Sequence, residues 1–132
     1  ECKDGQFVSI GSIEPQFYAL LRKLAGLTDA DYDAQMDAKG WPALKQKLAA
    51  VFKSKTRDEW CAIMEGSDVC FAPILTMSEA TQHPHMKARD VFITRHGIPQ
   101  PAPAPRFSRT PSNVREPVTA NLDDIVKAWS AT

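Results

Sequence analysis

The sequence lacks a long apolar run, an excess of charge of either sign, and paired cysteines. No apolar stretch approaches the roughly 20 residues that a membrane-spanning helix needs. Sixteen basic and sixteen acidic residues cancel, so the composition predicts no binding to nucleic acid or to an anionic membrane. The cysteines are odd in number (Cys2, Cys61 and Cys70) and form no C-x-x-C pair. This favours a reducing, cytoplasmic compartment, with Cys61 and Cys70 as small core residues.

Familiar catalytic and metal-binding motifs are also missing. The sequence contains no G-x-S-x-G and no glycine-rich phosphate loop. His83 and His85 are separated by a single proline, His96 is distant, and no carboxylate or cysteine stands beside them at a ligand spacing. The aspartates of residues 27–40 lack the glycine and the closing glutamate of a calcium loop. We therefore expect no metal site.

The most informative segment that is present runs from Phe7 to Phe17, a short apolar strand followed by a small-residue turn and a helix start. Pro15 is favoured at the first helical position, because its missing N–H costs nothing there. Glu14 is then the N-cap residue, where unpaired N–H groups and the helix dipole favour its ionised form. The plain interpretation is a capping carboxylate. The alternative is a fixed anion at the rim of a functional site.

The remaining patterns predict an α+β domain, with a short antiparallel sheet covered by three to four helices. Helices are expected at 15–25, 42–53 and 57–65, the last opened by a capping box between Thr56 and Glu59. Another helix starts after a capping box at residues 76–79 and is interrupted by Pro84. Strands are expected at 69–72 and 91–94. The predicted core consists of Leu20, Leu24, Leu48, Phe52, Trp60, Ile63 and Phe71.

Proline divides the chain, because six of its ten prolines lie between Pro99 and Pro117. We expect residues 1–97 to form the small domain, 98–117 an extended arm that does not fold back, and 118–132 to hold a helix at 122–129. That helix is assigned to another, missing domain. At the other end, Asp4-Gly5 indicates a hairpin turn. The absence of an initiator methionine then suggests an excised domain or the tail of a longer chain.

Several motifs resemble, in the same order along the chain, the family III CoA-transferase superfamily and its α-methylacyl-CoA racemase branch. The clearest is the run from Gly11 to Tyr18, which includes Ile13-Glu14-Pro15-Gln16. It is followed by Trp41-Pro42, Thr56-x-x-Glu59-Trp60-Cys61, the segment from Asp68 to Leu75, His83-Pro84-His85, and the segment from Pro105 to Pro111. The resemblance covers roughly residues 1–117.

The resemblance implies a two-domain subunit with a large CoA-binding domain, of which this chain would be the small domain and arm, and an interlocked homodimer. In such racemases one group removes the proton α to a thioester, and another group returns it on the opposite face. The resemblance places the principal His and Asp bases in the large domain. It makes Glu14 the third functional acid, charging and orienting a nearby imidazole. We assign Gly11 and Ile13, on the turn before Glu14, to substrate binding.

The leading functional hypothesis is therefore a fragment of an enzyme of fatty-acid metabolism that racemises 2-methylacyl-CoA thioesters. Coenzyme A is part of the substrate, and no separate cofactor is expected. One alternative is a family III CoA-transferase that moves CoA between carboxylic acids. The other is that the isolated chain is a non-catalytic module for dimerisation and for the rim of the substrate site. Residues 1–132 by themselves are expected to be inactive.

Overall fold

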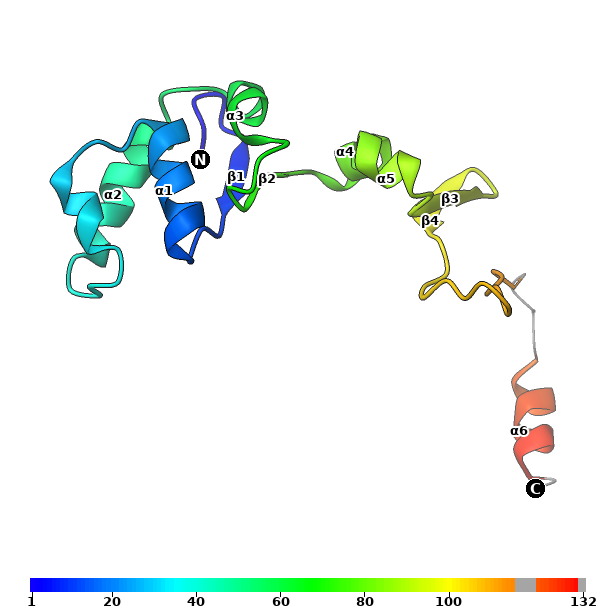
Figure 1. The fold of residues 1–132 in the computed structure, drawn as a ribbon. Coiled ribbons are helices and arrows are strands. Elements are labelled where there is room, and N and C mark those ends of the chain that lie inside the picture. Colours follow the sequence, from blue (N-terminus) through cyan, green and yellow to red (C-terminus); the bar gives the residue numbers. More distant parts are fainter. Residues whose placement is uncertain (116–120, 131–132) are drawn as a thin grey trace. The chain divides into compact units, whose positions relative to one another are not determined.

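A two-stranded antiparallel sheet joins the beginning of the chain to a segment about half its length away (Figure 1). Strand β1 (Phe7–Ile10) pairs with β2 (Phe71–Ile74), with Phe7 opposite Ile74 and Ile10 opposite Phe71. Strand β2 starts two residues later than the predicted 69–72. The reason is Cys70, whose φ of 56° is left-handed and cannot continue a strand.

The structure, a computed structural model, describes residues 1–115 and 121–130. The chain divides into two compact units, Glu1–Ser78 and Glu79–Thr132. The predicted assignment of residues 1–97, 98–117 and 118–132 to a small domain, an arm and a missing domain remains a prediction.

Helices α1 (Pro15–Ala25), α2 (Trp41–Phe52) and α3 (Arg57–Met64) form the helical part of the first unit. Their bounds agree with the predicted ranges to within a residue. Helix α1 ends at Gly26, which adopts the left-handed conformation that glycine allows at a helix end. Helix α3 begins with the predicted capping box, in which Thr56 and Glu59 each bond the other's backbone N–H. A 3-10 helix (Ala30–Ala34) lies in the acidic loop.

The core of the first unit is centred on Trp60, which is buried against Phe52. Their ring centroids lie 5.0 Å apart, and the Trp60 indole N–H donates to the Phe52 carbonyl oxygen over 2.9 Å. These two predicted core residues are buried, and the other five are partly buried and pack against the core. The buried hydrophobic residues are Cys2, Leu21, Leu27, Tyr32, Leu44, Phe52, Trp60, Met64 and Val69.

The expectation that Cys61 and Cys70 are core residues was wrong, since neither belongs to the hydrophobic core. Cys70 is exposed, because its left-handed backbone lies at the surface between Val69 and β2, and Cys61 is only partly buried. Cys2 is the cysteine that joins the core.

The N-terminal residues form a turn rather than half of a hairpin. The backbone N–H of Cys2 donates to the Gln6 carbonyl oxygen over 2.7 Å, and Gly5 adopts a φ of 76° within the turn. The residues before the turn are not a strand, and β1 pairs only with β2 among the residues described. The Asp4-Gly5 pattern therefore predicted the turn correctly, but the turn does not connect two paired strands.

The second unit contains a β-hairpin that was not predicted, because the prolines of its second strand indicated an extended arm instead. Helix α4 (Met77–Gln82) begins at the division between the units, and α5 (Pro84–Ala88) starts at the proline that interrupts it. Strand β3 (Phe92–Arg95) then pairs antiparallel with β4 (Ile98–Pro101). The turn between them is His96-Gly97, both with positive φ, as in type I′ turns. The first residues of the predicted arm are therefore a strand.

The arm also folds back, contrary to expectation. The Arg106 guanidinium donates to the backbone carbonyl oxygens of Arg89 and Asp90, over 2.7 Å for Asp90. The Ala102 N–H donates to the Val91 carbonyl oxygen over 2.8 Å. Prolines do not prevent this, because the bonds come from a side chain and from residues between the prolines. Residues 116 and 117 of the predicted arm lie outside the described residues.

Helix α6 (Leu122–Ser130) confirms the predicted C-terminal helix. Its apolar side chains are all exposed, with Trp129 80% exposed. Its assignment to a missing domain is still a prediction, and residues 118–120 and 131–132 lie outside the described part of the chain. Within the described ranges, no helix is long and apolar enough to cross a membrane.

Candidate functional site

Glu14 lies at the start of α1 with its side chain exposed to solvent. It is the N-cap residue, with extended backbone angles (φ −67°, ψ 145°) and Pro15 directly after it. Its carboxylate makes no capping hydrogen bond, and no ion pair joins it to any side chain that the structure describes. The Glu14 carboxylate is therefore exposed at the start of a helix and is not engaged in capping.

The turn before Glu14 is fixed to the segment that leads into β2. The Gly11 N–H donates to the Cys70 carbonyl oxygen over 2.9 Å. The Ser12 hydroxyl, which is buried, donates to the Val69 carbonyl oxygen over 2.5 Å. The left-handed Cys70 thus turns two successive carbonyl groups toward this turn. These bonds hold the backbone that carries Glu14.

Gln35 holds the same turn from its other side. Its side-chain amide donates to the carbonyl oxygens of Ser12, over 3.1 Å, and Ile13, over 2.9 Å. The Gln35 carbonyl oxygen in turn accepts a hydrogen bond of 2.9 Å from the Trp41 indole N–H. Gln35 could not be identified from the sequence, because it lies in a polar loop and no spacing relates it to Glu14. We regard it as a positioning residue for the turn.

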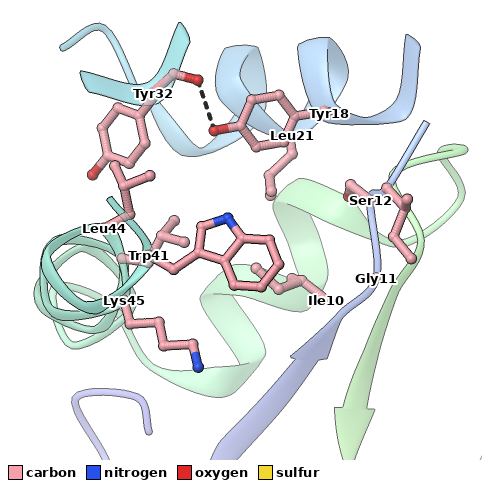
Figure 2. Close-up of a pocket in the computed structure, with 11 residues that line it drawn as sticks. Ile10, Gly11, Ser12, Tyr18, Leu21, Tyr32, Trp41, Leu44 and Lys45 are labelled. Carbon is pink, nitrogen blue, oxygen red and sulfur yellow. Dashed lines mark hydrogen bonds between the residues drawn. The ribbon is translucent and has the colours of Figure 1, made fainter. Parts of the chain in front are cut away.

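A cavity of about 430 Å³ opens beside this turn, between β1, α1 and α2 (Figure 2). Its volume is within the range of small-molecule sites. Gly11 and Ile13, the two residues assigned to substrate binding, both line it, whereas Glu14 is the residue that follows Ile13. The lining residues are Ile10, Gly11, Ser12, Ile13, Tyr18, Leu21, Tyr32, Trp41, Leu44, Lys45 and Leu48.

The walls of the cavity are mostly apolar, and the polar groups of the Ser12, Tyr18 and Trp41 side chains are already hydrogen-bonded. The Tyr18 hydroxyl donates to the Tyr32 carbonyl oxygen over 2.9 Å, drawn as a dashed line in Figure 2, and burial raises the pKa of Tyr18. The Ser12 hydroxyl is committed to Val69. Lys45 is the only lining residue with a charged side chain.

Glycine is not required at position 11 by the chain's own packing. A Cβ there would meet only the Cys70 carbonyl oxygen, at an ordinary contact distance of 3.9 Å. The Gly11 backbone is also not left-handed, unlike that of Gly26. A Gly11→Ala change should therefore leave the fold intact and alter the cavity wall alone.

No histidine occurs in residues 1–78, since the histidines are His83, His85 and His96. Among the described residues, no group of three or more His, Cys, Asp or Glu side chains could hold a metal ion. The described part of the first unit thus presents an exposed carboxylate next to a mostly apolar cavity.

The α+β fold of this chain is similar to that in a crystal structure of Rv3272 from M. tuberculosis. The TM-score is 0.69 at 17% identity, over 84% of this chain and 32% of that one. The family model "CoA-transferase family III" matches residues 1–120, and the chain belongs to this family.

Within the family the chain is similar to α-methylacyl-CoA racemases. It is 49% identical to the enzyme of that name from Mus musculus and 46% identical to that from Homo sapiens, each over 110 residues. These alignments cover 83% of this chain and 29% of each relative. A CaiB/baiF CoA-transferase family protein of Caenorhabditis elegans is 30% identical over 103 residues. The chain spans less than a third of the length of these relatives.

Proposed function

We propose that this chain is the small domain and the C-terminal arm of an enzyme that racemises 2-methylacyl-CoA thioesters. The observation that carries the proposal is Glu14, an exposed carboxylate without a capping bond or ion pair, next to Ile13 on the wall of an apolar cavity. The similarity to enzymes named α-methylacyl-CoA racemase, at 46–49% identity, supports the choice of reaction.

The reaction exchanges the configuration at the carbon α to the thioester carbonyl. A base removes the α-proton, the negative charge spreads onto the thioester oxygen, and an acid on the opposite face returns a proton. A His and an Asp of the large domain supply the two proton-transfer groups. Glu14 orients and charges the imidazole, because a carboxylate beside a histidine favours its protonated form. Gly11 and Ile13 contact the substrate.

This role requires the rest of the protein. The missing large domain binds coenzyme A, and two subunits form a homodimer in which the small domain closes the site. The enzyme works in the cytoplasm in fatty-acid metabolism and uses no cofactor besides the CoA of its substrate. The isolated residues 1–132 are inactive, because they lack the His and Asp bases.

A CoA-transferase is the second candidate, since the family itself is named for that reaction. The two differ in their need for an acceptor. The full-length protein is incubated with a 2-methylacyl-CoA in deuterated water without any free carboxylic acid, and deuterium at the α-carbon is followed by mass spectrometry. A racemase incorporates deuterium under these conditions. Acyl exchange that requires a free acid, without deuterium uptake, would refute the racemase proposal.

A further inference from the structure

The indole of Trp41 links the start of α2 to the turn that precedes Glu14. Trp41 is the first residue of α2, and its side chain extends into the cavity (Figure 2). Its indole N–H donates to the backbone carbonyl oxygen of Gln35 over 2.9 Å. We propose that Trp41 is a positioning residue for Glu14 and that it acts through Gln35. The inference rests on the proposed function and adds a residue to its site.

The Gln35 side chain is the part of this link that contacts the turn. Its amide nitrogen carries two hydrogens and donates to two acceptors, the carbonyl oxygens of Ser12 at 3.1 Å and Ile13 at 2.9 Å. The Ile13 carbonyl belongs to the same planar peptide unit as the Glu14 N–H. A fixed Ile13 oxygen therefore fixes the plane from which Glu14 extends. The Glu14 carboxylate makes no capping bond, so its direction depends on this backbone.

Gln35 itself needs a support, because it lies in a loop. It directly follows the 3-10 helix Ala30–Ala34 and is only partly buried. Trp41 attaches this loop to a rigid element, since α2 packs into the core through the buried Leu44 and Phe52. The hydrogen bonds made by Trp41 and Gln35 thus run without a break from α2 to the turn.

Two substitutions of tryptophan separate this link from the other effects of an indole. Trp41→Phe keeps an aromatic ring on the cavity wall and removes the N–H donor. Trp60→Phe is the matched control, because the Trp60 indole also donates to a backbone carbonyl oxygen, that of Phe52, over 2.9 Å. Trp60 is buried in the core and lies outside the cavity lining. The control therefore loses the same kind of hydrogen bond away from the turn.

Hydrogen exchange of the full-length protein, followed by mass spectrometry of peptides that span residues 10–17, measures how firmly the turn is held. We expect Trp41→Phe to exchange about fivefold faster there than the wild type, the factor that corresponds to about 1 kcal/mol for one hydrogen bond. Gln35→Leu should accelerate the exchange at least as much. In the Gln35→Leu background Trp41→Phe should add nothing, because both residues act along one path. Trp60→Phe should accelerate exchange in α3 and leave the turn unchanged.

Deuterium uptake at the α-carbon of a 2-methylacyl-CoA measures the effect on the reaction. Trp41→Phe should lower kcat about fivefold, since the hydrogen bond that it removes is the same, whereas Trp60→Phe should leave kcat unchanged. In the Glu14→Gln background Trp41→Phe should lower kcat no further, because no carboxylate remains to be positioned.

Several results would overturn the proposal. Unchanged hydrogen exchange of the turn in Trp41→Phe, or an equal acceleration in Trp60→Phe, would refute the link whether or not the protein is a racemase. A change confined to KM, or an equal fall in kcat with and without the Glu14 carboxylate, would make Trp41 a wall of the cavity and no more. A wild type without deuterium uptake, together with a loosened turn in Trp41→Phe, would refute the racemase alone.

Discussion

Replacing Glu14 by glutamine should lower turnover strongly and stability only slightly. The side chain makes no capping hydrogen bond, so the change removes only the attraction between the carboxylate and the helix dipole. At an exposed helix start that attraction is worth about 0.3–1 kcal/mol. If Glu14 orients and charges a catalytic histidine, its loss should cost a rate factor near the lower end of the roughly 10²–10⁴-fold range for acid–base groups.

The two effects are measured on the same full-length preparation. Urea unfolding followed by circular dichroism gives the free energy of unfolding, and deuterium uptake at the α-carbon gives the rate. Glu59→Gln is a matched control, since it also removes a negative charge from the first turn of a helix. Glu59 accepts hydrogen bonds from the Thr56 N–H and hydroxyl, so this variant should lose more stability than Glu14→Gln and keep its rate.

Two results would contradict this role of Glu14. A Glu14→Gln enzyme that exchanges the α-proton as fast as the wild type would show that the carboxylate only marks a helix start. A large loss of stability in that variant would instead reveal a structural partner that the described residues do not include.

Four further predictions follow from the packing, the hydrogen bonds and the charges. Truncating the buried Trp60 to alanine should lower the free energy of unfolding by about 3–5 kcal/mol in urea titrations, and a change under 1 kcal/mol would refute its place in the core. Gln35→Leu removes both hydrogen bonds to the turn before Glu14 and should lower the α-proton exchange rate at saturating substrate. An unchanged rate would show that the turn keeps its conformation without these hydrogen bonds. Hydrogen bonds from Thr56 hold the pKa of Glu59 below its ordinary 4.5, so their stabilisation is complete above that pH and is lost as the pH falls through the lowered value. The stability difference between wild type and Glu59→Gln should therefore shrink below about pH 4.5, and a constant difference would contradict the pKa shift. Finally, iodoacetamide followed by peptide mass spectrometry should modify the exposed Cys70 before the buried Cys2, whose pKa is raised by burial; equal rates would argue against that burial.

Local signals in the sequence predicted the helices well. Pro15 and Gly26 mark the ends of α1, and the Thr56 capping box marks the start of α3, because these residues act on backbone groups within a few positions. The position of Glu14 followed from the same kind of signal. Apolar periodicity also identified the sides of the helices that face the core, although it ranked Leu20 and Leu24 above the more deeply buried Leu21.

Contacts between distant segments could not be predicted from local patterns. No spacing in the sequence relates Gln35 to Ser12 and Ile13, since the bonds depend on how the acidic loop folds back. The β4 strand was missed for a different reason. Pro99 and Pro101 lack an N–H, which argues against a central strand, but an edge strand in a two-stranded hairpin tolerates them.

The pairing of β1 with β2 has a consequence for how the protein is made. All three long helices of the first unit lie in the chain between these two strands. During synthesis the helices can therefore form before β1 has a partner, and the sheet closes only after residue 74 has emerged. Gly11 and Ser12 bond to the backbone of residues 69 and 70, so the turn that carries Glu14 is assembled at that same late step. Pairings between such distant segments are slow to form. The candidate site is therefore complete only after β1 and β2 have paired.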